Sequence, residues 1–297
     1  MAYIIENAHI LKGEQIQDLS LLIKEDRIAS ARDSFKMYKH LRMDASEFIM
    51  TPTHVLLDFH PPLHESFEQR KAYYVENFLK RGVTTVLTCI NVQRERQLDK
   101  ELKKLHTALI DSPFDYVVGV CVPSTLLNPG FIRKCKKEKI PAIFVNITNE
   151  SEIQRVPWGW IKEAMFPYNC PIIPVFKTAD KRVKKTWGHY VESVHLPSFK
   201  DTLPMCQPLE RNVLEKIGIY PRKSYLHDGG EVSYNFYLKD SETVKMIESE
   251  LFLKQHSKLV ITVHKGKVIR AGKQICYRPG FGEHVQINTP AFYQSPR

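Results

Sequence analysis

Residues 55–60, Val55-Leu56-Leu57-Asp58-Phe59-His60, begin the pattern that decides the fold of this chain. The run starts without alternation of polar and apolar residues, which is typical of a parallel strand buried on both faces. Residues 65–81 follow with apolar side chains at helical spacing, and Gly82 gives this predicted helix a common C-terminal cap. A second apolar strand is expected over 83–90. Together these segments predict a βα unit whose two strands are parallel.

The same alternation of strand and helix continues toward the C-terminus. Strands that alternate with helices in this way form right-handed parallel units. The region 51–217 is shorter than the ~200 residues of the smallest complete eight-unit barrels, so we expect an incomplete or open TIM-like (β/α) barrel. Further strands are expected over 116–122, 142–147, 171–176 and 191–196, and further helices over 94–109, 129–139, 153–165 and 209–217.

Both chain ends are rich in β-prone sequence. Residues 4–10 and 21–28 form such runs near the start, and a predicted hairpin covers 259–271 near the end. Ends that share this character on either side of a βα centre favour a discontinuous design. We predict a small composite β-sandwich domain from residues 1–50 and 218–297, and a truncated barrel domain from residues 51–217. The predicted fold class is α/β.

The composition is that of a globular protein. The 297 residues are 43% hydrophobic and 26% charged, which is enough apolar side chain for a well-buried core. No apolar run reaches the ~18 residues that a membrane span needs, and the N-terminus lacks the pattern of a signal peptide. The six cysteines form no Cys-x-x-Cys pair. These features predict a cytoplasmic protein with free thiols.

The formal net charge is +10, and much of it lies in residues 133–139 and 181–185. A basic surface of this kind can attract nucleic acid or an anionic small molecule. Acidic residues are interspersed among the basic ones, however, and no motif of a nucleic-acid-binding fold is present. We therefore expect solvated helix faces, and keep a basic nucleic-acid-binding module as the third of three functional hypotheses.

Five motifs resemble the amidohydrolase superfamily, on its dihydroorotase and hydantoinase side, and one of them, residues 55–60, looks like its first barrel strand. Residues 4–10 are similar to the family's opening strand, and 82–87 to the Gly-Val-Thr-Thr run before its second barrel strand. Gly218-Ile219-Tyr220-Pro221-Arg222-Lys223, with 229–232 after it, looks like the family's return from barrel to sandwich. Residues 267–273 look like its closing hairpin. The resemblance implies a barrel flanked by a sandwich that both chain ends build.

The resemblance also implies a metal site. In that family a metal-bound hydroxide attacks the substrate, because a divalent cation lowers the pKa of bound water to roughly 7. His60 matches the first of two metal-binding histidines on the first barrel strand, but Pro62 stands in place of the second. His64 and His195 are the candidates to replace the missing ligands. At most one divalent metal, zinc, manganese or iron, is expected on His60 with His64 or His195.

Other positions of the family's site also differ. Thr148 stands where the family often has a carbamylated lysine, and Phe176 stands where it has a further histidine. Lys177 follows directly and is the candidate for binding a substrate. Asp58 is the nearest candidate for a catalytic proton acceptor, and a structural role on loop amides is its alternative.

These differences favour a catalytically impaired or non-catalytic relative, a pseudoenzyme that holds no metal and has a binding or assembly role. An open barrel exposes strand edges, and proteins cover such edges, so we expect a homo-oligomer. The alternative is a metal-dependent hydrolase of carbon–nitrogen bonds, which would take a small cyclic amide as its ligand.

Overall fold

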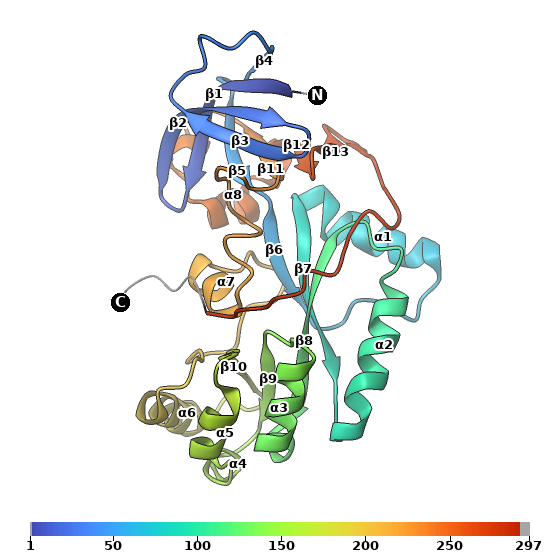
Figure 1. Ribbon diagram of the computed structural model, residues 1–297, viewed down its shortest axis with the longest axis vertical. Helices are drawn as coiled ribbons and strands as arrows, with labels where there is room; N and C mark the ends of the chain where they lie inside the picture. Colours follow the sequence, from blue (N-terminus) through green and yellow to red (C-terminus); the bar gives the residue numbers. More distant parts are fainter. Residues whose placement is uncertain (1, 292–297) are drawn as a thin grey trace.

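The computed structural model describes residues 2–291, which form two β-sheets with helices around them (Figure 1). The strands of one sheet come from both ends of the chain, and those of the other come from its centre. In the view of Figure 1 the first sheet lies above the second. Within the described residues, no helix has the length and apolar character to cross a membrane.

The first sheet has nine strands and folds back on itself. Its two sequence halves meet where β5 pairs antiparallel with β11. Ile10, Leu21, Phe236 and Val263 pack in one core between these halves, which gives the sheet the character of a small sandwich. In spatial order the strands are β14 (Gln274–Ile275), β13 (Lys267–Ala271), β12 (Leu259–His264), β11 (Tyr234–Leu238), β5 (Phe48–Pro52), β1 (Ala2–Lys12), β2 (Gln15–Lys24) and β3 (Arg27–Arg32), and β4 (Leu41–Asp44) also pairs with β1.

The second sheet has five parallel strands and curls like half of a barrel (Figure 1). Strands that follow one another in the sequence are neighbours throughout, as successive βα units require. Apolar side chains are buried on both faces, which explains the missing polar alternation. The strands are β6 (His54–Asp58), β7 (Val83–Asn91), β8 (Asp115–Pro123), β9 (Ile143–Ile147) and β10 (Ile172–Phe176). The α/β class and the open half barrel therefore agree with the expectation.

Six helices cover the outer face of this sheet. Their buried side chains share one apolar core with strand residues such as Leu56, Val86 and Val120. Ser66 begins the first helix with a capping box, and Gly82 closes the turn after it at φ 72°, in the left-handed region that glycine favours. The helices are α1 (Phe67–Asn77), α2 (Leu98–Ala108), α3 (Pro129–Lys137), α4 (Glu150–Gln154), α5 (Trp158–Met165) and α6 (Lys181–Val194).

The prediction of a strand over 191–196 is wrong, because most of this segment belongs to α6. Trp187, Val191 and Val194 lie three or four residues apart and pack on the same core. The apolar residues that suggested a strand are therefore the buried stripe of a helix. His195 follows as the C-cap, with left-handed backbone at φ 53°.

A helix and the C-terminal segment fill the inner face of the half barrel. Ile217 of α7 (Arg211–Ile217) packs in one core with Leu57 and Leu87 of the sheet. Val285 and Ile287 join the same core from the C-terminal segment, which passes in front of the sheet in Figure 1. These elements occupy the space that further strands would enclose in a complete barrel.

The chain itself covers part of both edges of the five-stranded sheet. At the β10 edge Ser198 pairs with Ile172, and at the β6 edge Pro208 pairs with Leu56. Residues 197–209 therefore run from one edge to the other. The expectation of a homo-oligomer rested on uncovered edges, so this argument for it is weakened. Self-association stays a prediction.

Candidate functional site

Asp58 ends β6 at the carboxyl edge of the sheet, the edge where enzymes built from parallel βα units carry their active sites. Its carboxylate is buried, and both oxygens are engaged. Oδ1 accepts a 2.9 Å hydrogen bond from the backbone N–H of His60, and Oδ2 accepts a 3.0 Å bond from the hydroxyl of Tyr73. Burial, followed by the charge of Asp58, raises the pKa of Tyr73, so the phenol keeps its proton and donates. Asp58 thus ties the loop after β6 to α1.

His60 and His64 lie in the loop between β6 and α1, and both are exposed. Phe59 instead turns to the inner face, where its ring meets that of Phe144 edge-on at 4.9 Å. Within the described residues, neither histidine belongs to a group of three or more side chains placed to hold a metal. Both histidines lie at the carboxyl edge, apart from the one donor group found in residues 2–291.

His195 lies at the opposite, amino edge of the sheet. It stands three residues before Ser198, which pairs with Ile172, the first residue of β10. His60, in contrast, follows the last residue of β6. The structure does not bring these two histidines together. A strand over 191–196 would have carried His195 to the carboxyl edge, whereas the helix carries it away.

Lys177 directly follows β10 at the carboxyl edge and is exposed. Its backbone N–H donates a 2.9 Å hydrogen bond to the carbonyl of Ile147. Nearby, the amide of Asn146 donates a 3.4 Å bond to Sγ of Cys121. Burial raises the pKa of the Cys121 thiol, although Asn146 and the charge of Lys177 both lower it. The thiol is therefore protonated at neutral pH, and Lys177 lies exposed near it.

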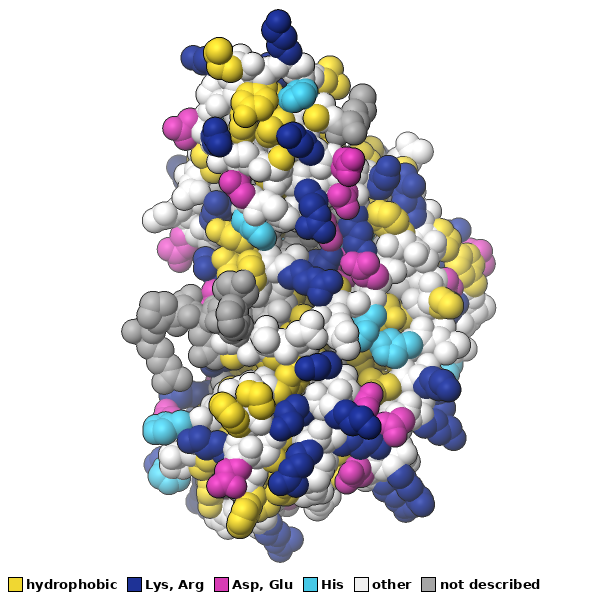
Figure 2. Space-filling view, viewed as in Figure 1, with side chains coloured by type: hydrophobic (Ala, Val, Ile, Leu, Met, Phe, Trp, Pro, Cys, Tyr) yellow, Lys and Arg dark blue, Asp and Glu magenta, His cyan; other side chains and the backbone are white. Residues whose placement is uncertain are grey.

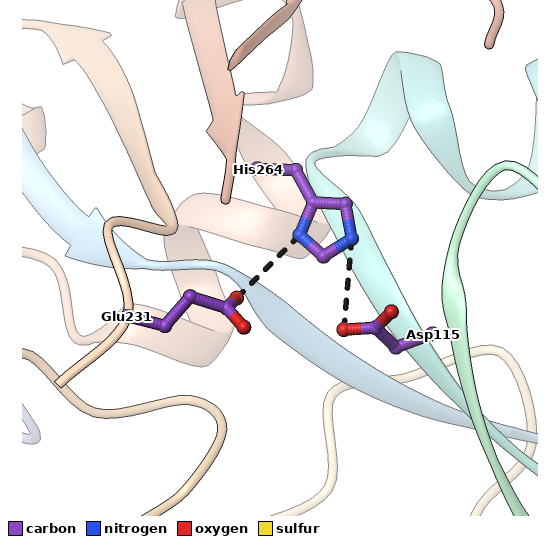
Figure 3. A group of neighbouring side chains, drawn as sticks. All are labelled: Asp115, Glu231 and His264. Carbon is purple, nitrogen blue, oxygen red and sulfur yellow. Dashed lines mark ion pairs between the residues drawn. The ribbon is translucent and has the colours of Figure 1, made fainter. Parts of the chain in front are cut away.

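Three side chains that the motif analysis did not name as ligands meet at the amino edge (Figure 3). Asp115 begins β8, His264 ends β12, and Glu231 precedes β11. Nε2 of His264 lies 3.6 Å from Oδ2 of Asp115, and Nδ1 lies 3.6 Å from Oε1 of Glu231. One ligand atom of each residue lies within 4.8 Å of the other two. The imidazole thus stands between two carboxylates.

Two lysines neutralise these carboxylates. Nζ of Lys223 lies 2.5 Å from Oδ2 of Asp115 and 2.5 Å from Oε2 of Glu231. Nζ of Lys265 lies 2.6 Å from Oδ1 of Asp115, which also accepts a 2.9 Å bond from the backbone N–H of Glu283. The side chains of Asp115 and Lys223 are 0% and 4% exposed, so their charges interact with little screening by water.

The charges of this cluster set one another's protonation states. Burial alone would raise the pKa of Asp115, but His264, Lys223 and Lys265 hold it well below its usual value. Burial also opposes the charge of Lys223, yet Asp115 and Glu231 raise the pKa of its ammonium above the ordinary value. At neutral pH Asp115 is therefore a carboxylate and Lys223 an ammonium. The cluster is an ion-pair network that joins the central sheet to the chain ends.

The donor types of this cluster match those of a metal site. Zinc, manganese and iron accept carboxylate oxygen and imidazole nitrogen, and the spacing of Asp115, Glu231 and His264 could hold such an ion. The ammonium of Lys223, however, already lies against both carboxylates. The three donors therefore fit a divalent metal only after Lys223 moves away or loses its proton.

The sequence carries signals for this network that the motif analysis used only for the fold. Lys223 ends the motif 218–223, and Glu231 lies inside the motif 229–232. His264 opens the predicted hairpin turn. A charged residue such as Asp115 at the start of an apolar run needs a partner once that run is buried. The partners, however, lie far away in the sequence, so local spacing does not reveal them.

On the face that Figure 2 shows, basic side chains are scattered rather than gathered in one stripe. Figure 2 shows Lys and Arg on this face with Asp and Glu among them. Lys134 pairs with Asp99 at 2.9 Å, and Lys200 pairs with Glu192 at 2.7 Å. This arrangement is the one expected of solvated helix faces.

Solved structures share the fold of this chain. The dihydropyrimidinase from Brevibacillus agri is similar at 8% sequence identity and a TM-score of 0.64, with 100% of each chain covered. The L-hydantoinase (dihydropyrimidinase) from Arthrobacter aurescens is similar at 12% identity and a TM-score of 0.57, over 96% of this chain and 99% of that one. The N-isopropylammelide isopropylaminohydrolase from Burkholderia multivorans is similar at 10% identity and a TM-score of 0.51, over 93% and 100%.

Comparison by sequence finds no such similarity. No protein-family model matches the chain, and no curated protein matches it. The likeness is therefore carried by the arrangement of strands and helices. At these identities it shows the fold alone, and the fold that the motifs implied is confirmed.

Proposed function

We propose that this chain, which has the fold of the amidohydrolase superfamily, is a binding protein that carries out no metal-hydroxide chemistry. One observation carries the proposal. The inner face of the half barrel is packed with α7 and the C-terminal segment instead of being open to a substrate. Leu87 and Phe144 of the sheet share this core with Ile217 and Val285.

The side chains at the carboxyl edge support the same proposal. Metal-dependent hydrolysis needs about three protein ligands around one open position. Both oxygens of Asp58 hold other groups, and His60 and His64 are exposed. His195 lies at the other edge. These positions at the carboxyl edge therefore support a protein that has the fold of the family without its metal centre.

The test is the metal content and hydrolytic activity of the purified native protein. Zinc, manganese and iron would be measured by elemental analysis, and hydantoin and 5,6-dihydrouracil would be offered with and without each metal. We expect metal at background and no hydrolysis above that of a sample without protein. Stoichiometric metal together with hydrolysis would overturn the proposal.

A second function is favoured by a different observation. Solved structures with this fold include a dihydropyrimidinase and an L-hydantoinase, and one group of donors could hold a metal. In a metal-dependent hydrolase of carbon–nitrogen bonds, one zinc, manganese or iron ion would be held by Asp115, Glu231 and His264 after Lys223 has moved. A small cyclic amide would then enter through the cavity of about 390 Å³ that Lys223, Glu231 and Lys265 line.

Two variants locate any metal that is found. Glu231→Gln removes a donor at the amino edge, and His60→Ala removes one at the carboxyl edge. If the second function is correct, Glu231→Gln loses both metal and hydrolysis, while His60→Ala keeps both. Loss in His60→Ala alone would instead place the metal at the carboxyl edge, as the sequence motifs predict.

A further inference from the structure

We propose that a cavity between the nine-stranded sheet and α7 binds a small planar molecule that carries one carboxylate. None of the residues of the charged cluster, Asp115, Lys223, Glu231, His264 and Lys265, lines this cavity. The loop after β6 does not line it either. The inference therefore stands whether or not metal-dependent hydrolysis is found.

The cavity has the size and walls of a small-molecule site. Its volume is about 350 Å³, and its lining has more apolar than polar character. Ligand pockets in proteins are often of roughly 300–1,000 Å³, mostly apolar, and placed between domains. Here β1, α7 and the start of α8 (Glu248–Lys254) supply walls. Apolar lining residues include Ile10, Pro208, Leu214, Leu226 and Ile247.

Two tyrosines in the wall suit a planar ligand. The rings of Tyr220 and Tyr225 lie 4.9 Å apart at 50° to one another. Burial, followed by the neighbouring Tyr225, raises the pKa of Tyr220 to about 12. Its phenol is therefore neutral at physiological pH and brings no negative charge into the cavity. Flat rings pack well against such aromatic walls.

Two cations stand over these rings. The guanidinium carbon of Arg211 lies 4.5 Å from the centroid of Tyr220, and Nζ of Lys12 lies 5.5 Å from that of Tyr225. Nε of Arg211 donates a 2.8 Å bond to Oε1 of Glu215, which fixes the plane of the guanidinium. Within residues 2–291, Lys12 forms no ion pair, and Arg211 pairs only with Glu215. A held guanidinium fork matches the two oxygens of a carboxylate.

The acids of the lining disfavour a ligand with more than one negative charge. Glu14, Glu210 and Glu248 also line the cavity. Oε1 of Glu248 lies 3.4 Å from Nδ1 of the buried His54, and this Nδ1 atom has no hydrogen-bond partner within the described residues. Three carboxylates repel a dianion or polyanion such as a phosphate ester. A monocarboxylate can approach Arg211 and Lys12 and place its ring on the apolar wall.

Calorimetric titration with matched probes tests the proposal. Benzoate and indole-3-carboxylate would be compared with benzamide and indole-3-carboxamide, which keep the shape and lose the charge. We expect saturable binding of at least one carboxylate and at least about tenfold weaker binding of its amide, since a charged hydrogen bond contributes ~1.5–3 kcal/mol. No binding of either carboxylate, or equal binding of acid and amide, overturns the proposal.

Two variants place the binding in this cavity. Arg211→Gln is expected to lower carboxylate affinity at least about tenfold. The matched control, Arg182→Gln, changes an exposed arginine at the start of α6 and should leave the affinity unchanged. Ser249→Trp adds a large side chain to the cavity lining and should abolish binding, while circular dichroism verifies that each variant is folded. Unchanged affinity in both Arg211→Gln and Ser249→Trp overturns the assignment.

Discussion

The two edges of the five-stranded sheet handle their polar residues in opposite ways. At the carboxyl edge Asp58 bonds to a loop amide and a tyrosine, and His60 and His64 are exposed. At the amino edge Asp115 and Lys223 are buried in a charged network that links strands from distant parts of the chain. In barrels of this kind the carboxyl edge carries chemistry and the amino edge carries stability. In this chain the stabilising role of the amino edge is therefore more evident than a catalytic role of the carboxyl edge.

The largest expected effect is the loss of a charge at the amino edge. Lys223→Met keeps most of the apolar stem and removes the ammonium that lies between two carboxylates. Breaking a buried ion pair costs about 3–5 kcal/mol, because the remaining charge is uncompensated. Urea denaturation should show this fall in the free energy of unfolding.

The control for that experiment is Lys80→Met, because Lys80 forms an exposed pair with Glu76 in adjacent helical turns. We expect a change within about 0.5 kcal/mol for this variant. If Lys223→Met costs no more than Lys80→Met, the amino edge does not depend on its ion pairs, and the comparison of the two edges fails.

The next largest effect is expected from weakening the packing of α7 on the inner face of the half barrel. Ile217 of α7 is fully buried in the inner core, so Ile217→Ala should cost about 2–5 kcal/mol. Thermal and urea unfolding would measure the loss. Ile110→Ala is the matched control, because Ile110 is 78% exposed and should tolerate the change. Equal effects of the two substitutions would mean that α7 does not seal the inner face.

The free energy of unfolding should also depend on pH through His284, which lies near the amino edge. Burial, followed by His106 and Arg222, lowers the pKa of His284 to about 4. The unfolded chain takes up this proton near pH ~6.5, so it binds more protons than the folded chain between pH ~6.5 and ~4. The free energy of unfolding should therefore fall as the pH is lowered through this window.

The variant His284→Gln tests the source of that dependence. Urea midpoints measured across the same window should fall less steeply in the variant than in the native protein. His284 lies beside Tyr116, near the start of β8, and shares its surroundings with His106, whose pKa burial also lowers. An unchanged slope would assign the acid sensitivity to other groups.

The smallest effect is expected at the carboxyl edge. His60→Ala and His64→Ala remove exposed imidazoles, so each should change the free energy of unfolding by less than about 0.5 kcal/mol. Metal content should also be the same in both variants as in the native protein. A loss of bound metal in either variant would reverse the roles of the two edges.

Local pattern predicts the central sheet well because its strands are buried on both faces. The apolar runs at 55–57 and 83–90 need no knowledge of distant residues. The same logic fails at 191–196, where two valines three residues apart, Val191 and Val194, fit a helix as readily as a strand. Periodicity alone does not separate these cases in short apolar runs.

Features that depend on distant residues could not be read from the sequence. Ser198 pairs with Ile172, and Pro208 pairs with Leu56. Ser198 and Pro208 both belong to the segment 197–209, which has no apolar pattern of its own. Asp115 contacts Lys223 and His264, which both lie more than 100 residues further along the chain. Spacing in one sequence does not reveal contacts between such distant residues, although the motif 218–223 does contain one of the partners, Lys223.

The pairing of β5 with β11 has a consequence for synthesis on the ribosome. Met50 of β5 pairs with Phe236 of β11, and the whole central sheet is translated between them. At ~5–20 residues per second, roughly 10–40 s pass before the partner strand emerges. During that interval one edge of β5, an apolar strand, has no partner from its own chain. The nascent chain, more than the finished protein, is the form that needs protection from aggregation.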